Sequence, residues 1–147
     1  MNQKRWINRS QPQTLFSAVL LSYFSAGLLL LGNRIDVQLG RDVFERIVSL
    51  FADERTAFDL SGRLVVPAVT VLLCGAYIAG GAGTARERRW GHWLCSAAAI
   101  YAAVATLWWG ARTSYELGVL MRLMFDALLL VLLYHPMSRD YRRVWFR

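Results

Sequence analysis

The sequence contains few cysteines, which could form disulfides, and few prolines, which restrict the backbone. Its 147 residues include 2 Cys, 3 Pro and 11 Gly, which argues against a disulfide scaffold and against a collagen-like repeat. Charged residues make up only 18%, whereas a soluble domain averages about 25%. Intrinsic disorder is therefore disfavoured, because disordered chains are polar and highly charged. The length allows a single domain.

Motifs that carry chemistry are also missing. The sequence contains no HExxH zinc site, no GxSxG nucleophile elbow and no phosphate-binding loop. The glycine-rich stretch 80–83 lacks the Lys-Ser/Thr pair of a phosphate cradle. The acidic residues of 33–63 lack the spacing of a calcium loop, and arginines compete for them. We therefore predict that the protein is not an enzyme and holds no metal and no cofactor.

The sequence is instead rich in long apolar stretches. Hydrophobic residues make up 56% of the chain. Four stretches approach or reach the roughly 20 helical residues that cross a bilayer, namely 14–32, 64–83, 91–110 and 114–134. Apolar residues occur on all sides of each stretch, as in lipid-embedded helices, and little polar surface is left to cover a soluble bundle. We predict an all-α integral membrane four-helix bundle that forms one domain over 1–147.

The net charge of +7 is unevenly distributed along the chain. The N-terminal tail, the 84–90 connection and the 135–147 tail together carry +8, whereas the 33–63 loop carries −1. With four spans, the three basic segments fall on one face of the membrane. The positive-inside rule then predicts that both termini are cytoplasmic and that the 33–63 loop lies outside. Arginine outnumbers lysine sixteen to one, which favours a GC-rich bacterial genome and hence the inner membrane.

Arginines and tryptophans gather at the predicted span ends, as expected for residues at the headgroup level. We predict that the cytoplasmic set contacts anionic lipid headgroups. That set is Arg86, Arg88, Arg89, Arg139, Arg142, Arg143 and Trp145. The mixture of arginine and aromatic residues in the 135–147 tail resembles an RNA-binding pattern, but its place directly after a span favours lipid. We therefore predict no nucleic-acid partner.

The 33–63 loop is the only sizeable segment outside the predicted spans. Val43, Ile47, Leu50 and Phe51 recur in it at helical spacing, which predicts a short amphipathic helix. Two interpretations remain open: an interfacial or partner-binding helix, and a lid packed over the outer ends of its own bundle. We favour the lid.

The sharpest polar feature lies inside the fourth predicted span. Arg122 and Asp126 are four residues apart, so they share one helix face at about 6 Å of axial rise. Ionisable residues inside a membrane are functional candidates by default. The alternative is an ion pair that fixes helix packing, with Arg122 snorkelling outward. At the start of this span, Thr113 and Glu116 have the spacing of a capping box, with Thr113 as the N-cap.

Two histidines and several small residues complete the candidates. His92 and His135 fall at the cytoplasmic ends of adjacent spans, where they could meet and ligate a haem or a metal; interfacial histidines more often bind neither. Small residues spaced by four let helices approach closely, within the bundle or between subunits. The two such rows are Ala18, Ser22 and Ala26, and Gly75, Ala79 and Gly83.

These features favour a non-catalytic function. The first hypothesis is an accessory, scaffolding or regulatory subunit that contacts other membrane protein subunits or copies of itself. The alternative is a small oligomeric transporter or ion-conducting protein that uses Arg122 and Asp126. A haem-binding electron carrier rests only on His92 and His135.

Overall fold

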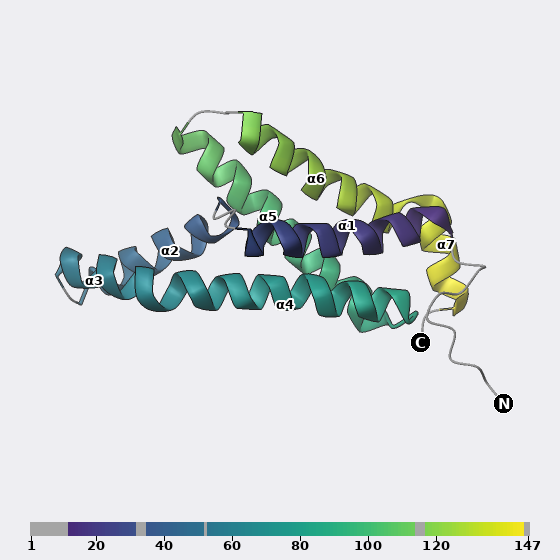
Figure 1. The fold of residues 1–147 in the computed structure, drawn as a ribbon, viewed down its shortest axis with the longest axis horizontal. Coiled ribbons are helices and arrows are strands. Elements are labelled where there is room, and N and C mark those ends of the chain that lie inside the picture. Colours follow the sequence, from purple (N-terminus) through teal and green to yellow (C-terminus); the bar gives the residue numbers. More distant parts are fainter. Residues whose placement is uncertain (1–11, 32–34, 52, 114–116, 146–147) are drawn as a thin grey trace.

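The computed structural model describes residues 12–31, 35–51, 53–113 and 117–145, and these contain helices and no strands (Figure 1). The elements are α1 (Gln13–Leu30), α2 (Ile35–Val48), α3 (Glu54–Leu60), the π-helical segment η1 (Ser61–Val65), α4 (Val66–Ala85), α5 (Arg89–Thr113), α6 (Leu117–Tyr134) and α7 (Pro136–Trp145).

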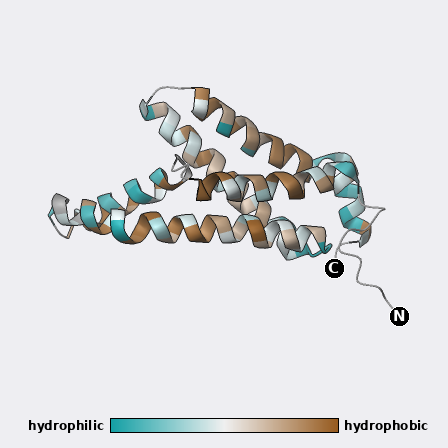
Figure 2. Ribbon diagram, viewed as in Figure 1, coloured by the Kyte–Doolittle hydropathy of each residue, from teal (hydrophilic) through white to brown (hydrophobic). Residues whose placement is uncertain are grey.

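Four helical stretches are long and apolar enough to cross a membrane: Gln13–Leu30, Phe58–Ala85, Arg89–Thr113 and Leu117–Tyr134. Figure 2 shows brown, hydrophobic residues along all four. The prediction of an all-helical protein with four helices long and apolar enough to span a membrane is thereby confirmed. The second helix begins earlier than predicted, because α3, η1 and α4 follow one another without a break.

One boundary prediction is wrong. Thr113 does not cap the fourth span, because it belongs to the last turn of α5, where its hydroxyl donates a hydrogen bond to the carbonyl of Trp109 at 2.9 Å. Glu116 lies outside the described residues. The other end of this span is as predicted: α6 ends at Tyr134, and Pro136 begins a new helix.

The four long helices form the bundle, in which α4 packs against α1 and α5, and α6 packs against α5 and α1. Glycines bring α4 and α5 into backbone contact. A Cβ added at Gly83 would come within 2.7 Å of the Cα of Gly91, and one at Gly80 within 2.8 Å of the nitrogen of Cys95. A residue larger than glycine would therefore force the two helices apart.

The small residues of α1 also face the interior, since Ala18, Ser22 and Ala26 are all buried. A Cβ at Gly81 of α4 would lie 2.3 Å from the Ser22 hydroxyl oxygen. The second predicted row is divided, because Gly83 is buried whereas Gly75 has open space around it.

Beyond the bundle, α2 and α3 form a helical hairpin that continues past the end of α1 (Figure 1). α2 packs against α5, α4 and η1, so it rests on its own bundle. The residues of the predicted apolar stripe do not form the contact with the bundle. Val37 is buried and Gly40 faces Tyr101 and Val69, whereas Val43, Ile47, Leu50 and Phe51 all point outward.

Candidate intramembrane site

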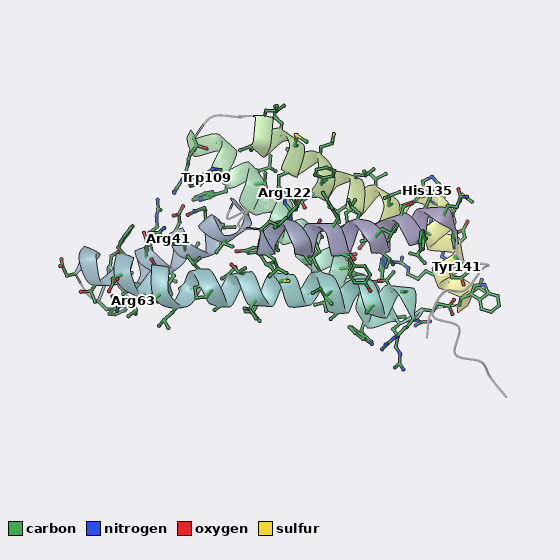
Figure 3. All side chains as sticks on the ribbon, in the orientation of Figure 1. Arg41, Arg63, Trp109, Arg122, His135 and Tyr141 are labelled. Carbon is green, nitrogen blue, oxygen red and sulfur yellow. The ribbon has the colours of Figure 1, made fainter. Side chains whose placement is uncertain are left out.

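The Arg122–Asp126 pair lies midway along the bundle, and Figure 3 labels Arg122 there. The Nη2 atom of Arg122 is 3.2 Å from Oδ1 of Asp126, and the side chains of Arg122 and Asp126 are 1% and 0% exposed. Both residues belong to the inward face of α6 together with Val119, Leu129 and Leu133. The ion pair is present, but the outward snorkelling of Arg122 that the structural alternative included is not found, because its guanidinium is enclosed by neighbouring helices.

Tyr77 of α4 connects this pair to two other helices. The Nη2 of Arg122 donates to the Tyr77 hydroxyl oxygen at 3.4 Å, and that hydroxyl donates to the carbonyl of Ala98 in α5 at 3.4 Å. Tyr77 itself is fully buried. The polar chain thus runs from α6 through α4 to α5 and holds three spans in register.

The opposite charges of Arg122 and Asp126 neutralise each other. A lone charge at this depth would be unfavourable by about 3 kcal/mol on insertion scales. With a carboxylate one turn away, Arg122 keeps its charge inside the bundle while the pair as a whole is neutral. The arrangement suits a structural clamp, and a change in either charge would be felt by all three helices.

His92 and His135 have different surroundings. His92 is buried, hydrogen-bonds with Arg142 of α7, and packs edge-on against Tyr134 at 5.3 Å between ring centroids. His135 is partly exposed, and its Nδ1 accepts a hydrogen bond from the backbone nitrogen of Met137 at 3.3 Å. Within the described ranges, no group of three or more His, Cys, Asp or Glu residues is placed to hold a metal ion.

The predicted lipid-contacting residues lie at the end of the bundle that carries α7. Six of the seven are exposed: Arg86, Arg88, Arg89, Arg139, Arg143 and Trp145. Arg142 differs, because it turns toward His92 and also lies over the Tyr134 ring at 5.7 Å. Part of the surroundings of the Arg142 guanidinium is therefore protein.

α7 is docked on the bundle by polar contacts. The Ser138 hydroxyl pairs with Thr14 of α1 at 2.8 Å, and the Tyr141 hydroxyl donates to Glu87 at 2.6 Å. Glu87 adopts a φ of 59°, as the tight connection between α4 and α5 requires. Figure 3 places Tyr141 and His135 at this same end. The C-terminal tail is therefore tied to the first span and to the 86–88 turn.

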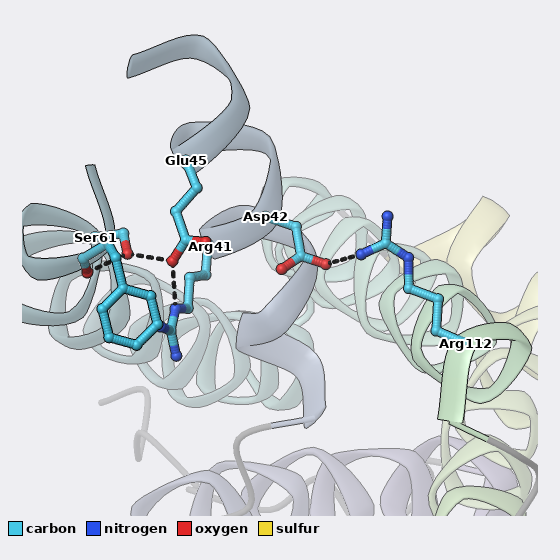
Figure 4. A network of polar contacts seen from close by, with 6 residues as sticks. Arg41, Asp42, Glu45, Ser61 and Arg112 are labelled. Carbon is cyan, nitrogen blue, oxygen red and sulfur yellow. Dashed lines mark hydrogen bonds and ion pairs between the residues drawn. The ribbon is translucent and has the colours of Figure 1, made fainter. Parts of the chain in front are cut away.

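A second polar network joins α2 to the opposite end of the bundle (Figure 4). Arg41 Nε contacts Oε1 of Glu45 at 2.7 Å, and the Ser61 hydroxyl donates to the same oxygen at 2.5 Å. Burial acts to raise the pKa of Glu45, but the hydrogen bonds from Ser61 and Arg41 and the charge of Arg41 outweigh it and hold that pKa below its ordinary value. Glu45 is therefore ionised at neutral pH.

The same helix face carries a contact to the end of α5. Nη1 of Arg112 lies 2.6 Å from Oδ2 of Asp42, and the Trp108 indole nitrogen donates to this oxygen at 3.3 Å. The Arg112 guanidinium also stacks over the Trp108 ring at 4.4 Å.

Comparisons with protein families, with curated proteins and with solved structures found no match for this chain. The assignment of function therefore depends on the residues themselves. Sequence reasoning missed Tyr77 and the Arg41–Glu45–Ser61 network. A tyrosine in the middle of an otherwise apolar span was the available signal for the first, since a buried hydroxyl needs a hydrogen-bond partner.

Proposed function

We propose that the protein is a multi-pass protein of the bacterial inner membrane that acts without catalysis, as an accessory, scaffolding or regulatory subunit of a larger membrane assembly. The observation that carries this proposal is the enclosure of Arg122 and Asp126, whose side chains are 1% and 0% exposed and which tie three spans together through Tyr77. The ionisable groups of the fourth span thus serve the packing of the bundle.

The proposed orientation places α7 and the 86–88 turn in the cytoplasm. Its support is the exposed arginines gathered at that end, at Arg86, Arg88, Arg89, Arg139 and Arg143. They are suitably placed for the phosphates of an anionic leaflet. On this orientation the α2–α3 hairpin lies on the extracytoplasmic side.

Purification from native membranes in mild detergent tests this function. A tagged full-length chain is isolated, and the co-purifying chains are identified and quantified by mass spectrometry. We expect at least one other membrane protein at fixed stoichiometry, also after a change of detergent. A monodisperse homo-oligomer with no stoichiometric partner would overturn the proposal.

The alternative is a small oligomeric transporter or ion-conducting protein, favoured by the position of a buried ionisable pair midway along a span. Asp126→Asn distinguishes the two. In a carrier it abolishes ion or substrate flux into proteoliposomes, whereas in a subunit it reduces stability or assembly. Asp59→Asn, at an exposed ion pair, is the control.

We also propose that no haem is bound, since His92 already contacts Arg142 and Tyr134. The visible spectrum of the natively purified protein checks this point. A Soret band that disappears in His92→Ala would contradict it.

A further inference from the structure

Along the middle of α2, three charged side chains are largely covered while nearby apolar ones are exposed. The covered side chains are those of Arg41, Asp42 and Glu45, which are only 22%, 21% and 28% exposed. The exposed apolar residues are Val43 and Ile47 of α2, and Leu50 and Phe51 directly after it. Val43, Ile47, Leu50 and Phe51 are 48%, 53%, 77% and 87% exposed.

The inward charges have protein partners and do not depend on water. Figure 4 shows the two contacts of Glu45, from Arg41 and Ser61, and the separate contact between Asp42 and Arg112. The Arg41 guanidinium also lies over the Phe58 ring at 4.4 Å. These three charges can therefore enter a poorly hydrated environment with their partners in place.

The contacts of Asp42 fix the depth of α2. Its partners are Trp108 and Arg112, at the end of α5. Tryptophan and arginine at the end of a span are anchors at the headgroup level. The middle of α2 therefore lies at this level, next to the boundary between headgroups and acyl chains.

Exposed apolar residues also occur in α3 and η1, which pack against α2 and lead into the second span. Phe58 and Leu64, which lie in α3 and η1 beside α2, are 61% and 59% exposed. The helix from Phe58 to Ala85 has 28 residues, or about 42 Å, whereas the hydrocarbon core is about 30 Å thick. Its first residues, which include the exposed Asp59 and Arg63, therefore extend beyond the core to the headgroup level beside α2.

From these observations we propose that α2 is an interfacial helix embedded in the leaflet at the Trp108 end of the bundle. Val43, Ile47, Leu50 and Phe51 contact phospholipid at the boundary between headgroups and acyl chains, and the exposed Arg46 reaches lipid phosphate. Lipid is favoured over a protein partner because Asp42 holds α2 beside Trp108 and Arg112 at the end of a membrane-spanning helix, and the neighbouring start of the second span also exposes apolar residues. This inference does not depend on the proposed subunit function.

Depth-dependent fluorescence quenching tests the proposal. The full-length protein carries a single introduced cysteine at Ile47, with Cys74 and Cys95 replaced by alanine, and is labelled with an environment-sensitive dye in phosphatidylcholine–phosphatidylglycerol vesicles. The quenchers are lipids with a nitroxide at a shallow or a deep acyl position, and aqueous iodide. A label at Ser49, a polar and exposed residue directly after α2, is the control for contact with water. A label at Leu72, which is exposed on α4, is the control for deep lipid.

The expected order is specific. The label at Ile47 is quenched by the shallow nitroxide roughly twofold more strongly than by the deep one, and iodide quenches it less than the label at Ser49. The label at Leu72 responds most to the deep nitroxide. A repeat at Val43 covers the case in which the Ile47 variant does not fold.

Two results would overturn the proposal. Equal iodide quenching at Ile47 and Ser49, with no response to nitroxide lipid, places α2 in water. Protection of Ile47 from all three quenchers places it under protein, and loss of that protection on dilution of the protein in lipid identifies the cover as a second copy. Neither result bears on co-purification of a partner subunit, so the two proposals fail independently.

Discussion

Removal of one charge from the buried pair is expected to destabilise the bundle severely, while removal of both charges is not. At 3.2 Å and an effective dielectric constant of about 20, the attraction between Arg122 and Asp126 amounts to about 5 kcal/mol. Asp126→Asn leaves a buried guanidinium without its counter-charge, so we expect a loss of about 3–5 kcal/mol in the free energy of unfolding. Arg122→Met leaves a buried carboxylate and should have a similar effect.

The double variant Arg122→Met/Asp126→Leu shows how removal of both charges differs from removal of one. Both charges are then replaced by apolar groups of comparable size, and desolvation no longer opposes folding. We expect the double variant to lie within about 1–2 kcal/mol of the wild type, or to be more stable than it. Strong non-additivity of this kind is what two groups in direct contact show.

The chain supplies its own matched control. Asp59 and Arg63 are also four residues apart and 3.2 Å from each other, but their side chains are 63% and 77% exposed. Water and ions screen this pair, so Asp59→Asn should change stability by at most about 0.5 kcal/mol. The contrast between the two pairs isolates burial as the cause.

Equilibrium unfolding by SDS in lipid bicelles, followed by circular dichroism, measures these values for the four variants and the wild type. A common slope of unfolding is required before midpoints are compared. The reasoning is refuted if Asp126→Asn lies within about 1 kcal/mol of the wild type, or if the losses of the two single variants add in the double variant.

Other expectations follow from individual contacts. Tyr77→Phe removes the hydroxyl that links α6 to α5 and should lower unfolding free energy by about 1 kcal/mol in the same assay; no change would show the bridge to be dispensable. Gly83→Ala should lose about 1–3 kcal/mol, since its Cβ would meet backbone at 2.7 Å, whereas Gly75→Ala, with open space, should be neutral or stabilising. Equal effects at the two glycines would refute the close approach of α4 and α5. Because the pKa of Glu45 is lowered in the folded state, its stabilisation is complete at neutral pH and is lost as pH falls from about 4.5 through the lowered value. Hydrogen-exchange protection factors in α2, which are corrected for the intrinsic pH dependence of exchange, should therefore fall below that pH in the wild type and stay nearly constant there in Glu45→Gln.

The spans were predictable because apolar length is a local property of the sequence. Each of the predicted stretches corresponds to a helix able to cross a membrane, and Pro136 ends the fourth where its missing N–H requires. The Arg122–Asp126 contact was likewise accessible, since four residues on one helix bring two side chains together. The Thr113 cap failed, because α5 continued through it and its hydroxyl found the Trp109 carbonyl within its own helix.

The sequence by itself determined the four long apolar helices, the two charges that share a face, and the apolar and polar residues of α2, but not the helix α7 in the C-terminal tail. Only the tertiary structure decided where the residues of α2 point. In a soluble protein the apolar face must turn inward, but a membrane offers apolar surroundings outside as well, so the pattern of Val43 and Ile47 did not reveal that they face outward. For the same reason Arg122 could have snorkelled to the surface; packing brought Tyr77 from a distant part of the chain to its guanidinium and enclosed it.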